Sequence, residues 1–263
     1  MLIGLDRYKS MLLEKLPDIN SSLILNGSKG VGKFSLISEV LSEMVNNMDN
    51  IHIIKSEEGK SQINVEQIRD LFETINLMPY NDTKHYIIID NAEQLNDVSF
   101  NLLLKRLEEP KPTEMFILIT SDLDKIATTI KSRCLIINIA LDSDVIQSHM
   151  DKIENETIKK VLLKLGFSHI IEYINNDAVK SKYEDAYKFG YNVLSISSRK
   201  QIGTISKQFI KDVKLNMEML LALSDNSEYI HQTYDLIQRD VVNTQILIDI
   251  MLYHLIETNK PRS

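Results

Sequence analysis

The stretch "SLILNGSKGVGKFSL", residues 22–36, decides the fold class of this 263-residue chain. It reads as a short apolar strand, a glycine-rich turn and the start of an amphipathic helix. The turn nearly matches G-x-x-x-x-G-K-[ST], in which backbone N–H groups surround phosphate oxygens, the lysine reaches the β- and γ-phosphates and the hydroxyl binds Mg²⁺. Gly27, Gly30, Gly32 and Lys33 fit this use, and Phe34 stands where the hydroxyl should be. We therefore expect a nucleotide-binding fold whose loop lacks its own magnesium ligand.

The first 140 residues alternate between apolar strands and helices. The predicted strands are 22–26, 51–55, 86–90, 115–120 and 135–139. Apolar residues follow one another in these runs rather than alternating with polar ones, which is typical of parallel strands covered on both faces. Helical spacing lies between them at 34–45 and 97–108, and from Asn64, where Gln67 completes a capping box. The pattern predicts an α/β domain with a doubly wound parallel sheet over residues 1–141.

The strand pattern disappears after residue 141. Helical spacing follows in segments 143–150, 155–165, 168–175, 179–193, 197–223 and 226–258. We predict a small helical domain at 142–181 and a C-terminal helical domain at 182–263. The last segment is expected to be one long amphipathic helix, which packs in a bundle within the chain or on another chain.

Composition narrows the class of protein. The formal net charge is −7 and the pI about 5.4, so the chain lacks the overall basic character of many nucleic-acid-binding proteins. Cys134 is the single cysteine, which excludes an intramolecular disulfide and a multi-cysteine zinc site. The longest apolar runs are strand-sized, far short of the roughly 20 residues of a membrane helix, and no secretory leader is recognisable. We expect a cytoplasmic globular protein.

A second motif bears on hydrolysis. Asp90 ends a predicted strand, where a carboxylate would help to hold Mg²⁺ in a hydrolysing site. Asn91 follows it, at the position where many such ATPases carry a glutamate, and an amide is no general base. Glu93 is expected to be a solvated carboxylate before the helix cap Asn96. Phe34 and Asn91 together predict that the chain does not hydrolyse a nucleotide by itself.

Arg133 lies just before the fifth predicted strand. A guanidinium there could project from the domain and reach a phosphate in another subunit, as an arginine finger does. It could equally be a partner in a surface salt bridge. The spacing leaves both readings open.

Five segments in order within residues 22–134 resemble the AAA+ subunits of bacterial sliding-clamp loaders, most closely the delta-prime type of DNA polymerase III. They are "GSKGVGK", "INVEQIRDL", "YIIIDNAEQLN", "NLLLKRLEEP" and "ILITSDLDKIATTIKSRC". The resemblance covers about half of the chain. Beyond residue 141 no motif matches, and the resemblance is limited to the all-helical character of a lid and a collar.

The resemblance implies roles for individual residues. Ser132, Arg133 and Cys134 form the SRC motif, whose arginine acts in trans on the ATP site of an adjacent subunit in this family. Thr120 matches the sensor position that contacts the γ-phosphate in active relatives. Cys134 is expected to be a small buried residue beside Arg133.

The resemblance also implies partners. They are the gamma/tau and delta subunits, the sliding clamp, and primed DNA reached mainly through the complex. Delta-prime subunits are commonly inactive and stator-like, and Phe34 and Asn91 agree with that type. A four-cysteine zinc module found in many relatives cannot exist with Cys134 alone.

Other functions are weighed against this one. An ATP-hydrolysing motor of the gamma/tau type would need Ser35 and Glu93 in shifted roles. A kinase would need an acceptor-binding motif, and none is recognised after residue 141. Sequence-specific DNA recognition would need a basic recognition helix. Weak ATP or ADP binding by Gly27, Lys33, Asp90 and their neighbours stays open.

Overall fold

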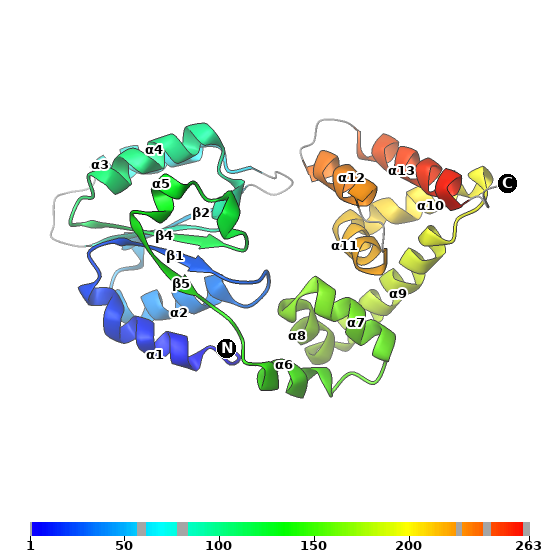
Figure 1. Ribbon diagram of the computed structural model, residues 1–263, viewed down its shortest axis with the longest axis horizontal. Coiled ribbons are helices and arrows are strands. Elements are labelled where there is room, and N and C mark those ends of the chain that lie inside the picture. Colours follow the sequence, from blue (N-terminus) through cyan, green and yellow to red (C-terminus); the bar gives the residue numbers. More distant parts are fainter. Residues whose placement is uncertain (1, 57–61, 78–83, 225–227, 239–242, 260–263) are drawn as a thin grey trace. The chain divides into compact units, whose positions relative to one another are not determined.

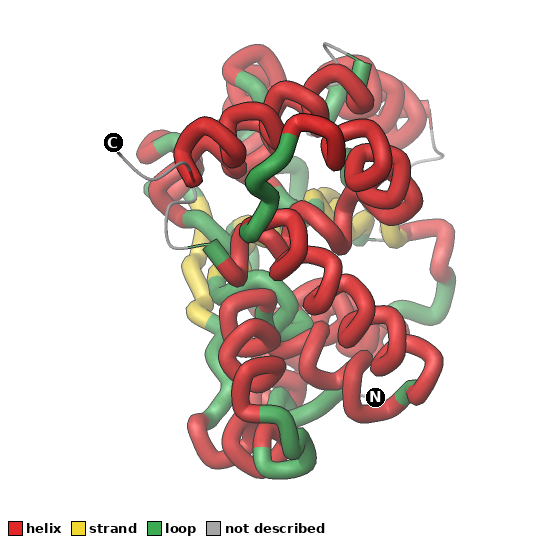
Figure 2. Tube along the Cα trace, turned by 90° about the vertical axis from the view of Figure 1, so that its right-hand side faces the viewer, coloured by secondary structure: helices red, strands yellow, loops and turns green. Residues whose placement is uncertain are grey.

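The computed structural model describes residues 2–56, 62–77, 84–224, 228–238 and 243–259. The chain divides into two compact units, residues 1–146 and 147–263. All strands of the described residues belong to the first unit, and Figure 2 draws them in yellow. The predicted end of the α/β domain at residue 141 lies close to the boundary between the units.

The first unit is built on a parallel sheet of five strands in the order β2-β3-β4-β1-β5 (Figure 1). The strands are β1 (Ser22–Asn26), β2 (Ile51–Ile54), β3 (His85–Ile89), β4 (Glu114–Thr120) and β5 (Cys134–Asn138). This confirms the predicted α/β fold class and each predicted strand. Because β1 lies between β4 and β5, the order of strands reverses beside it, and such a point leaves a crevice at the carboxyl ends of the strands.

Helices cover both faces of the sheet (Figure 1). On one side lie α1 (Asp6–Lys15) and α2 (Lys33–Met44), and on the other α3 (Val65–Leu77), α4 (Asp97–Glu108) and α5 (Thr128–Lys131). Strand β4 contributes to both cores, since Ile117 packs with the α2 side and Phe116 with the α3 and α4 side. Burial on both faces is the reason why the strands read as unbroken apolar runs.

Two helix starts follow the predicted caps. The Asn64 side chain accepts a hydrogen bond from the Glu66 N–H (3.2 Å), and the Gln67 side chain accepts one from the Asn64 N–H (3.0 Å). This is the reciprocal capping box that the sequence predicts for α3. Asn96 caps α4 by accepting from the Ser99 N–H (2.9 Å).

The second unit is helical throughout its described residues. The helices that follow the sheet are α6 (Ser143–Met150), α7 (Glu156–Leu165), α8 (Phe167–Asn175), α9 (Asp177–Leu194), α10 (Ile202–Phe209), α11 (Val213–Leu223), α12 (Glu228–Gln238) and α13 (Thr244–Asn259). The predicted boundary near residue 181 falls inside the continuous helix α9. This helix contacts both α8 and α11, for example through Tyr183, which donates a hydrogen bond to Glu172 of α8 (2.9 Å).

The prediction of one helix over 226–258 is wrong. Helix α12 ends at Gln238, and Asn243 begins α13 by accepting a hydrogen bond from the Gln245 N–H (2.9 Å). The two helices contact each other and share a core that contains Ile230 and Ile248. Apolar spacing alone did not separate the two helices, because both supply residues to one core at the same three- and four-residue steps.

Segment 197–223 is interrupted in the same way. It contains α10 and α11 rather than one helix, and Asp212 caps α11 by accepting from the Leu215 N–H (3.2 Å). Asp and Asn are common caps because their side chains satisfy N–H groups that the first helical turn leaves unpaired. Asp212 and Asn243 are therefore residues from which the starts of α11 and α13 could have been predicted.

Candidate functional site: a degenerate phosphate loop and an exposed arginine

The phosphate-type loop, residues 27–32, joins β1 to α2. Gly30 and Gly32 have positive φ angles of 78° and 96°, a left-handed conformation that glycine adopts without steric cost. At Gly27 the reason is different, because a Cβ atom would lie 2.2 Å from the backbone oxygen of Ile139. The loop backbone is thus held tightly against the residue that follows β5.

Lys33 is the buried charge of the loop. The residue is only 7% exposed. Its Nζ donates hydrogen bonds to the backbone oxygens of Gly27 (2.5 Å) and Ser28 (2.9 Å). Burial lowers the pKa of Lys33, and the nearby charges of Glu93 and Asp90 oppose that lowering. The ammonium group is therefore directed at the carbonyls of its own loop, and it would have to give up or share these bonds to hold a phosphate.

Phe34 replaces the metal-binding hydroxyl with a packed ring. It is partly buried against the core that contains Leu36, Ile37 and Val40 of the same helix. The position therefore contributes to packing, and it offers no oxygen to a metal ion.

Asp90 and Asn91 follow β3 at the same edge of the sheet. The Asp90 N–H donates to the backbone oxygen of Ile54 (2.8 Å), and burial raises the pKa of its carboxyl. Asn91 has φ 55° and is the single non-glycine residue with positive φ in the described chain. Asparagine is among the residues that tolerate this conformation best. Asn91 therefore suits the turn sterically, although it supplies no general base.

Glu93, expected to be a solvated carboxylate, is half-buried and hydrogen-bonded to two residues. One carboxylate oxygen accepts from the Thr120 hydroxyl (2.8 Å), and the other accepts from the Ser121 N–H (3.2 Å) and the Ser121 hydroxyl (2.6 Å). Thr120 is fully buried, and its hydroxyl donates a hydrogen bond to Glu93. Sequence reasoning missed the contact because it joins the ends of two strands, β3 and β4.

The carboxyl ends of the strands thus bring together Lys33, Asp90, Glu93 and Thr120. A carboxylate has about four acceptor positions, and three donors already contact that of Glu93. Those bonds hold the carboxylate against the end of β4. The arrangement can bind an anion at the loop and helix start, but it has the chemistry for hydrolysis only in part.

Arg133 lies between α5 and β5. Its side chain is 34% exposed and donates to Glu108 (2.9 Å), to the backbone oxygen of Thr129 (2.8 Å) and to the Ser132 hydroxyl (3.2 Å). Glu108 comes from the "LEEP" segment, so an ion pair joins the two most specific motifs of the sequence. The guanidinium is thereby held in one position at the surface of the first unit.

Arg133 and the phosphate-type loop lie at opposite ends of the neighbouring strands β1 and β5. In the register of β1 and β5, Ser22 pairs with Cys134 and Asn26 with Asn138. Arg133 precedes the start of β5, whereas Gly27 follows the end of β1. Arg133 is therefore six residues from Gly27 along the strand direction, which at about 3.3 Å per residue is roughly 20 Å. Arg133 is therefore not placed to contact a phosphate in its own loop.

The neighbours of Arg133 in the SRC motif are structural. Cys134 packs against the core beneath α4 and α5, and burial raises the pKa of its thiol to about 12, so the thiol is protonated at neutral pH. Ser132 donates to the backbone oxygen of Thr129 (2.9 Å).

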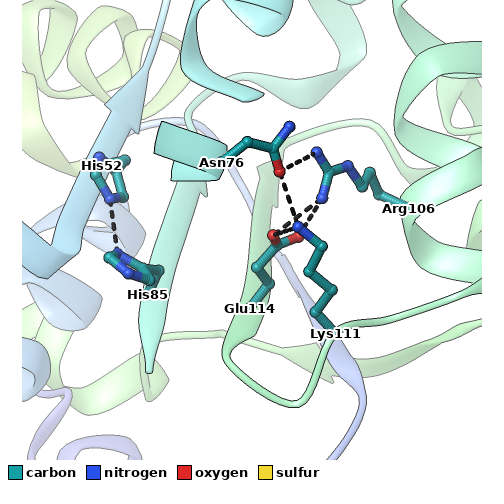
Figure 3. Close-up of polar contacts among 6 residues, drawn as sticks. All are labelled: His52, Asn76, His85, Arg106, Lys111 and Glu114. Atoms are coloured by element: carbon teal, nitrogen blue, oxygen red, sulfur yellow. Dashed lines mark hydrogen bonds and ion pairs between the residues drawn. The ribbon is translucent and has the colours of Figure 1, made fainter. Parts of the chain in front are cut away.

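Figure 3 shows two further polar groups at the amino-terminal edge of the sheet. His52 and His85 join β2 to β3 through their ring nitrogens (3.2 Å). Glu114, whose side chain is nearly inaccessible, binds Arg106 (3.0 Å) and Lys111 (3.3 Å). These contacts connect neighbouring elements and lie away from the phosphate-type loop.

The described residues contain no group of three or more His, Cys, Asp or Glu side chains that could hold a metal ion. Among the described helices, none is both long and apolar enough to cross a membrane.

Comparison with known proteins agrees with this geometry. Residues 39–143 match the family model "DNA polymerase III, delta subunit". The gamma subunit of DNA polymerase III from Buchnera aphidicola is 32% identical over 145 residues, which are 48% of this chain and 40% of that protein. This chain is thus similar to DNA polymerase III subunits over about half of its length. The tau subunit from Escherichia coli is 32% identical over 158 residues, 52% of this chain and 24% of that protein.

A delta-prime relative is also found. The DNA polymerase III subunit delta' of Haemophilus influenzae is 31% identical over 120 residues, 44% of this chain and 36% of that protein. These matches span well under half the length of the relatives named here. These matches support the resemblance to DNA polymerase III subunits seen in the sequence, while the clamp-loader role and the subunit type stay predictions.

A solved structure extends the likeness to both units. A DNA polymerase III gamma subunit-related protein from Thermotoga maritima covers 97% of this chain, and 99% of its own length is matched, with a TM-score of 0.61. The sequence identity is 17%, so this likeness concerns the fold alone.

Proposed function

We propose that the chain is a non-catalytic, stator-like subunit of a cytoplasmic DNA polymerase III clamp loader. It would donate Arg133 to the ATP site of a neighbouring gamma/tau-type subunit. The assembled complex, with a delta subunit, would then open the sliding clamp and place it on primed DNA. Residual ATP or ADP binding at Lys33 and its loop would serve no turnover.

The position of Arg133 carries the proposal. The guanidinium lies one strand length from its own loop and is partly exposed, which suits a group that acts on another subunit. Glu108 and the Thr129 carbonyl hold it there. An arginine finger held in place in this way stabilises the charge that develops on the transferred phosphoryl group.

The chain's own site supports a non-catalytic role. Phe34 packs in the core where a metal-binding hydroxyl would stand, and Asn91 follows Asp90. Glu93, the nearest carboxylate that could replace a general base, is engaged by Thr120 and Ser121. Two requirements of hydrolysis, a metal-binding hydroxyl and a general base, are therefore weakened in one site.

Helix α13 supports assembly with other subunits. Its buried residues pack in the core of the second unit, while Ile246 (51%), Ile250 (52%) and Tyr253 (42%) are exposed along the helix. A helix that is apolar on all sides is normally covered on all sides. We assign its outer face to contact with a gamma/tau-type subunit in a helical collar.

A gamma/tau-like motor is the second candidate. It is favoured by the matches to gamma and tau subunits and by the position of Glu93 beside Thr120. In that case Lys33 would be essential to turnover, whereas in a stator it would not.

Two substitutions in a loader reconstituted with gamma/tau-type and delta-type subunits separate the candidates. Arg133→Ala should lower DNA-stimulated ATP turnover by about 10³-fold in the site that receives the finger, because that is the low end of what such an arginine contributes. Lys33→Met should leave turnover of the complex within about twofold. Both complexes should assemble normally in size-exclusion chromatography.

Two outcomes would contradict the proposal. Unchanged turnover with Arg133→Ala would remove the finger role. A large loss with Lys33→Met in an intact complex would identify this chain as a motor. Glu108→Gln, which keeps the size of the side chain and removes its charge, should give an intermediate loss if the ion pair positions Arg133.

A further inference from the structure

We propose that the outer face of α10, with the turns at its two ends, is a binding site for the phosphate backbone of nucleic acid. The face lines an open groove of about 560 Å³ in the second unit. Its lining residues are Lys200, Gly203, Thr204, Lys207, Gln208 and Lys211. No role in the clamp-loader proposal uses these residues.

The groove is basic in an otherwise acidic chain. Between Ala186 and Lys211 the sequence contains no Asp or Glu, although the whole chain has 37 of them. The three groove lysines are exposed, and none of them forms an ion pair with a residue that the structure describes. Their charges are therefore available to an anionic ligand.

Helix α10 is held so that this face points outward. Phe209 and Ile205 pack into the core of the second unit, and Ser206 is hydrogen-bonded to Gln245 of α13. Just before the helix, Arg199 forms an ion pair with Glu257 of α13 (2.7 Å). Because the inner face is fixed by apolar and polar contacts, the lysines cannot turn toward the core.

The spacing of the lysines suits a phosphodiester chain. Lys207 lies in α10, and Lys200 and Lys211 lie in the 3-10 turns before and after it. At about 1.5 to 2 Å per residue, the three lysines span roughly 16 to 19 Å. One strand of B-form DNA passes about five phosphates over that length. Lysine binds phosphate as a mobile point charge, and Thr204 and Gln208 add neutral donors between the charges.

The chemistry of the groove favours nucleic acid over a protein partner. Protein interfaces are depleted in lysine and enriched in aromatic residues. This groove has three lysines and no aromatic or aliphatic side chain in its lining. The inference does not depend on the clamp-loader proposal, because it concerns the isolated chain and a different unit.

The test is fluorescence anisotropy with the full chain and a labelled oligothymidylate of about 20 nucleotides, at salt concentrations from about 50 to 200 mM. Lys200→Gln/Lys207→Gln/Lys211→Gln should weaken binding at least roughly tenfold at the lowest salt. The slope of log K against log salt should fall by about 2, since each lost single-strand phosphate contact removes about 0.7. Glutamine is a good helix former, so circular dichroism and thermal unfolding should be unchanged.

A matched control carries the same change in charge elsewhere. Lys105→Gln/Lys152→Gln/Lys160→Gln removes three exposed lysines outside the groove and should leave affinity within about twofold. Equal losses in both triple variants would overturn the proposal, as would absence of binding by the wild type. Displacement of the oligonucleotide by polyglutamate, by inorganic phosphate or by anionic vesicles at matched charge would assign the groove to another anion and also overturn it.

Discussion

Single residues fix the phosphate-type loop more through the backbone than through side chains. Gly27 is required because Ile139 approaches it, Gly30 and Gly32 because of their positive φ angles, and Asn91 because it tolerates a left-handed turn. The loop conformation can thus persist in a chain that has no hydroxyl for a metal ion. At this scale, a preserved loop is evidence of fold rather than of catalysis.

Gly27→Ala tests the close approach. The added methyl group would meet a backbone oxygen at 2.2 Å, which only a backbone shift can relieve. We expect the free energy of unfolding in urea to fall by about 1–3 kcal/mol, as for other overpacked sites.

Gly203→Ala is the matched control for that substitution. Gly203 lies inside α10, and a methyl group there would have nothing within 4 Å. It should raise the free energy of unfolding by up to about 1 kcal/mol, since alanine favours a helix over glycine. Similar effects of the two substitutions would show that the contact between Gly27 and Ile139 is not tight.

The residues of the site were predicted unequally well from sequence. Lys33, Asp90 and Arg133 lie at the element ends where motif spacing places them, namely the start of α2, the end of β3 and the start of β5. The bonds between Glu93 and Thr120, and between Arg133 and Glu108, were missed. Both join segments that are distant in sequence, so no local pattern encodes them.

At the scale of elements, β2 and β3 are joined by the pair His52 and His85 (Figure 3). Burial, and then the charge of His85, lowers the pKa of His52 below its ordinary value of 6.5. The unfolded chain therefore binds a proton at His52 at a pH where the folded chain does not. Well above pH 6.5 the free energy of unfolding does not depend on protonation of His52. It decreases as the pH falls from about 6.5 toward the lower pKa that His52 has in the folded chain.

His52→Asn should reduce this pH dependence. The free energy of unfolding should fall less between about pH 7.5 and 5.5 in the variant than in the wild type, as measured in urea at both pH values. His231→Asn, at an exposed position of α12, should keep the wild-type dependence. An identical pH dependence in all three proteins would show that His52 does not cause it.

Elements differ in how well their sequence predicts them. The strands and α3 were placed correctly because burial on both faces and the Asn64 capping box are local features. The break between α12 and α13 was not, because the apolar spacing continues across it. Caps such as Asp212 and Asn243 mark these turns better than hydrophobicity does.

At the scale of the whole molecule, the exposed side of α13 should decide assembly. Ile246→Asp/Ile250→Asp places charges on residues that are about half exposed and lie outside the core of the second unit. Folding should therefore persist, with circular dichroism like that of the wild type. Association with gamma/tau-type subunits should weaken by at least about 100-fold, because burying two unpaired carboxylates in an apolar contact is costly.

Leu163→Asp supplies the comparison, because Leu163 of α7 is equally exposed at 52% but lies on another helix. Size-exclusion chromatography and analytical ultracentrifugation of each mixture would measure complex formation. Loss of association with the α13 variant alone would make its outer face the subunit contact. Retained association would mean that the complex forms through other surfaces, and that the apolar outer face of α13 has another partner.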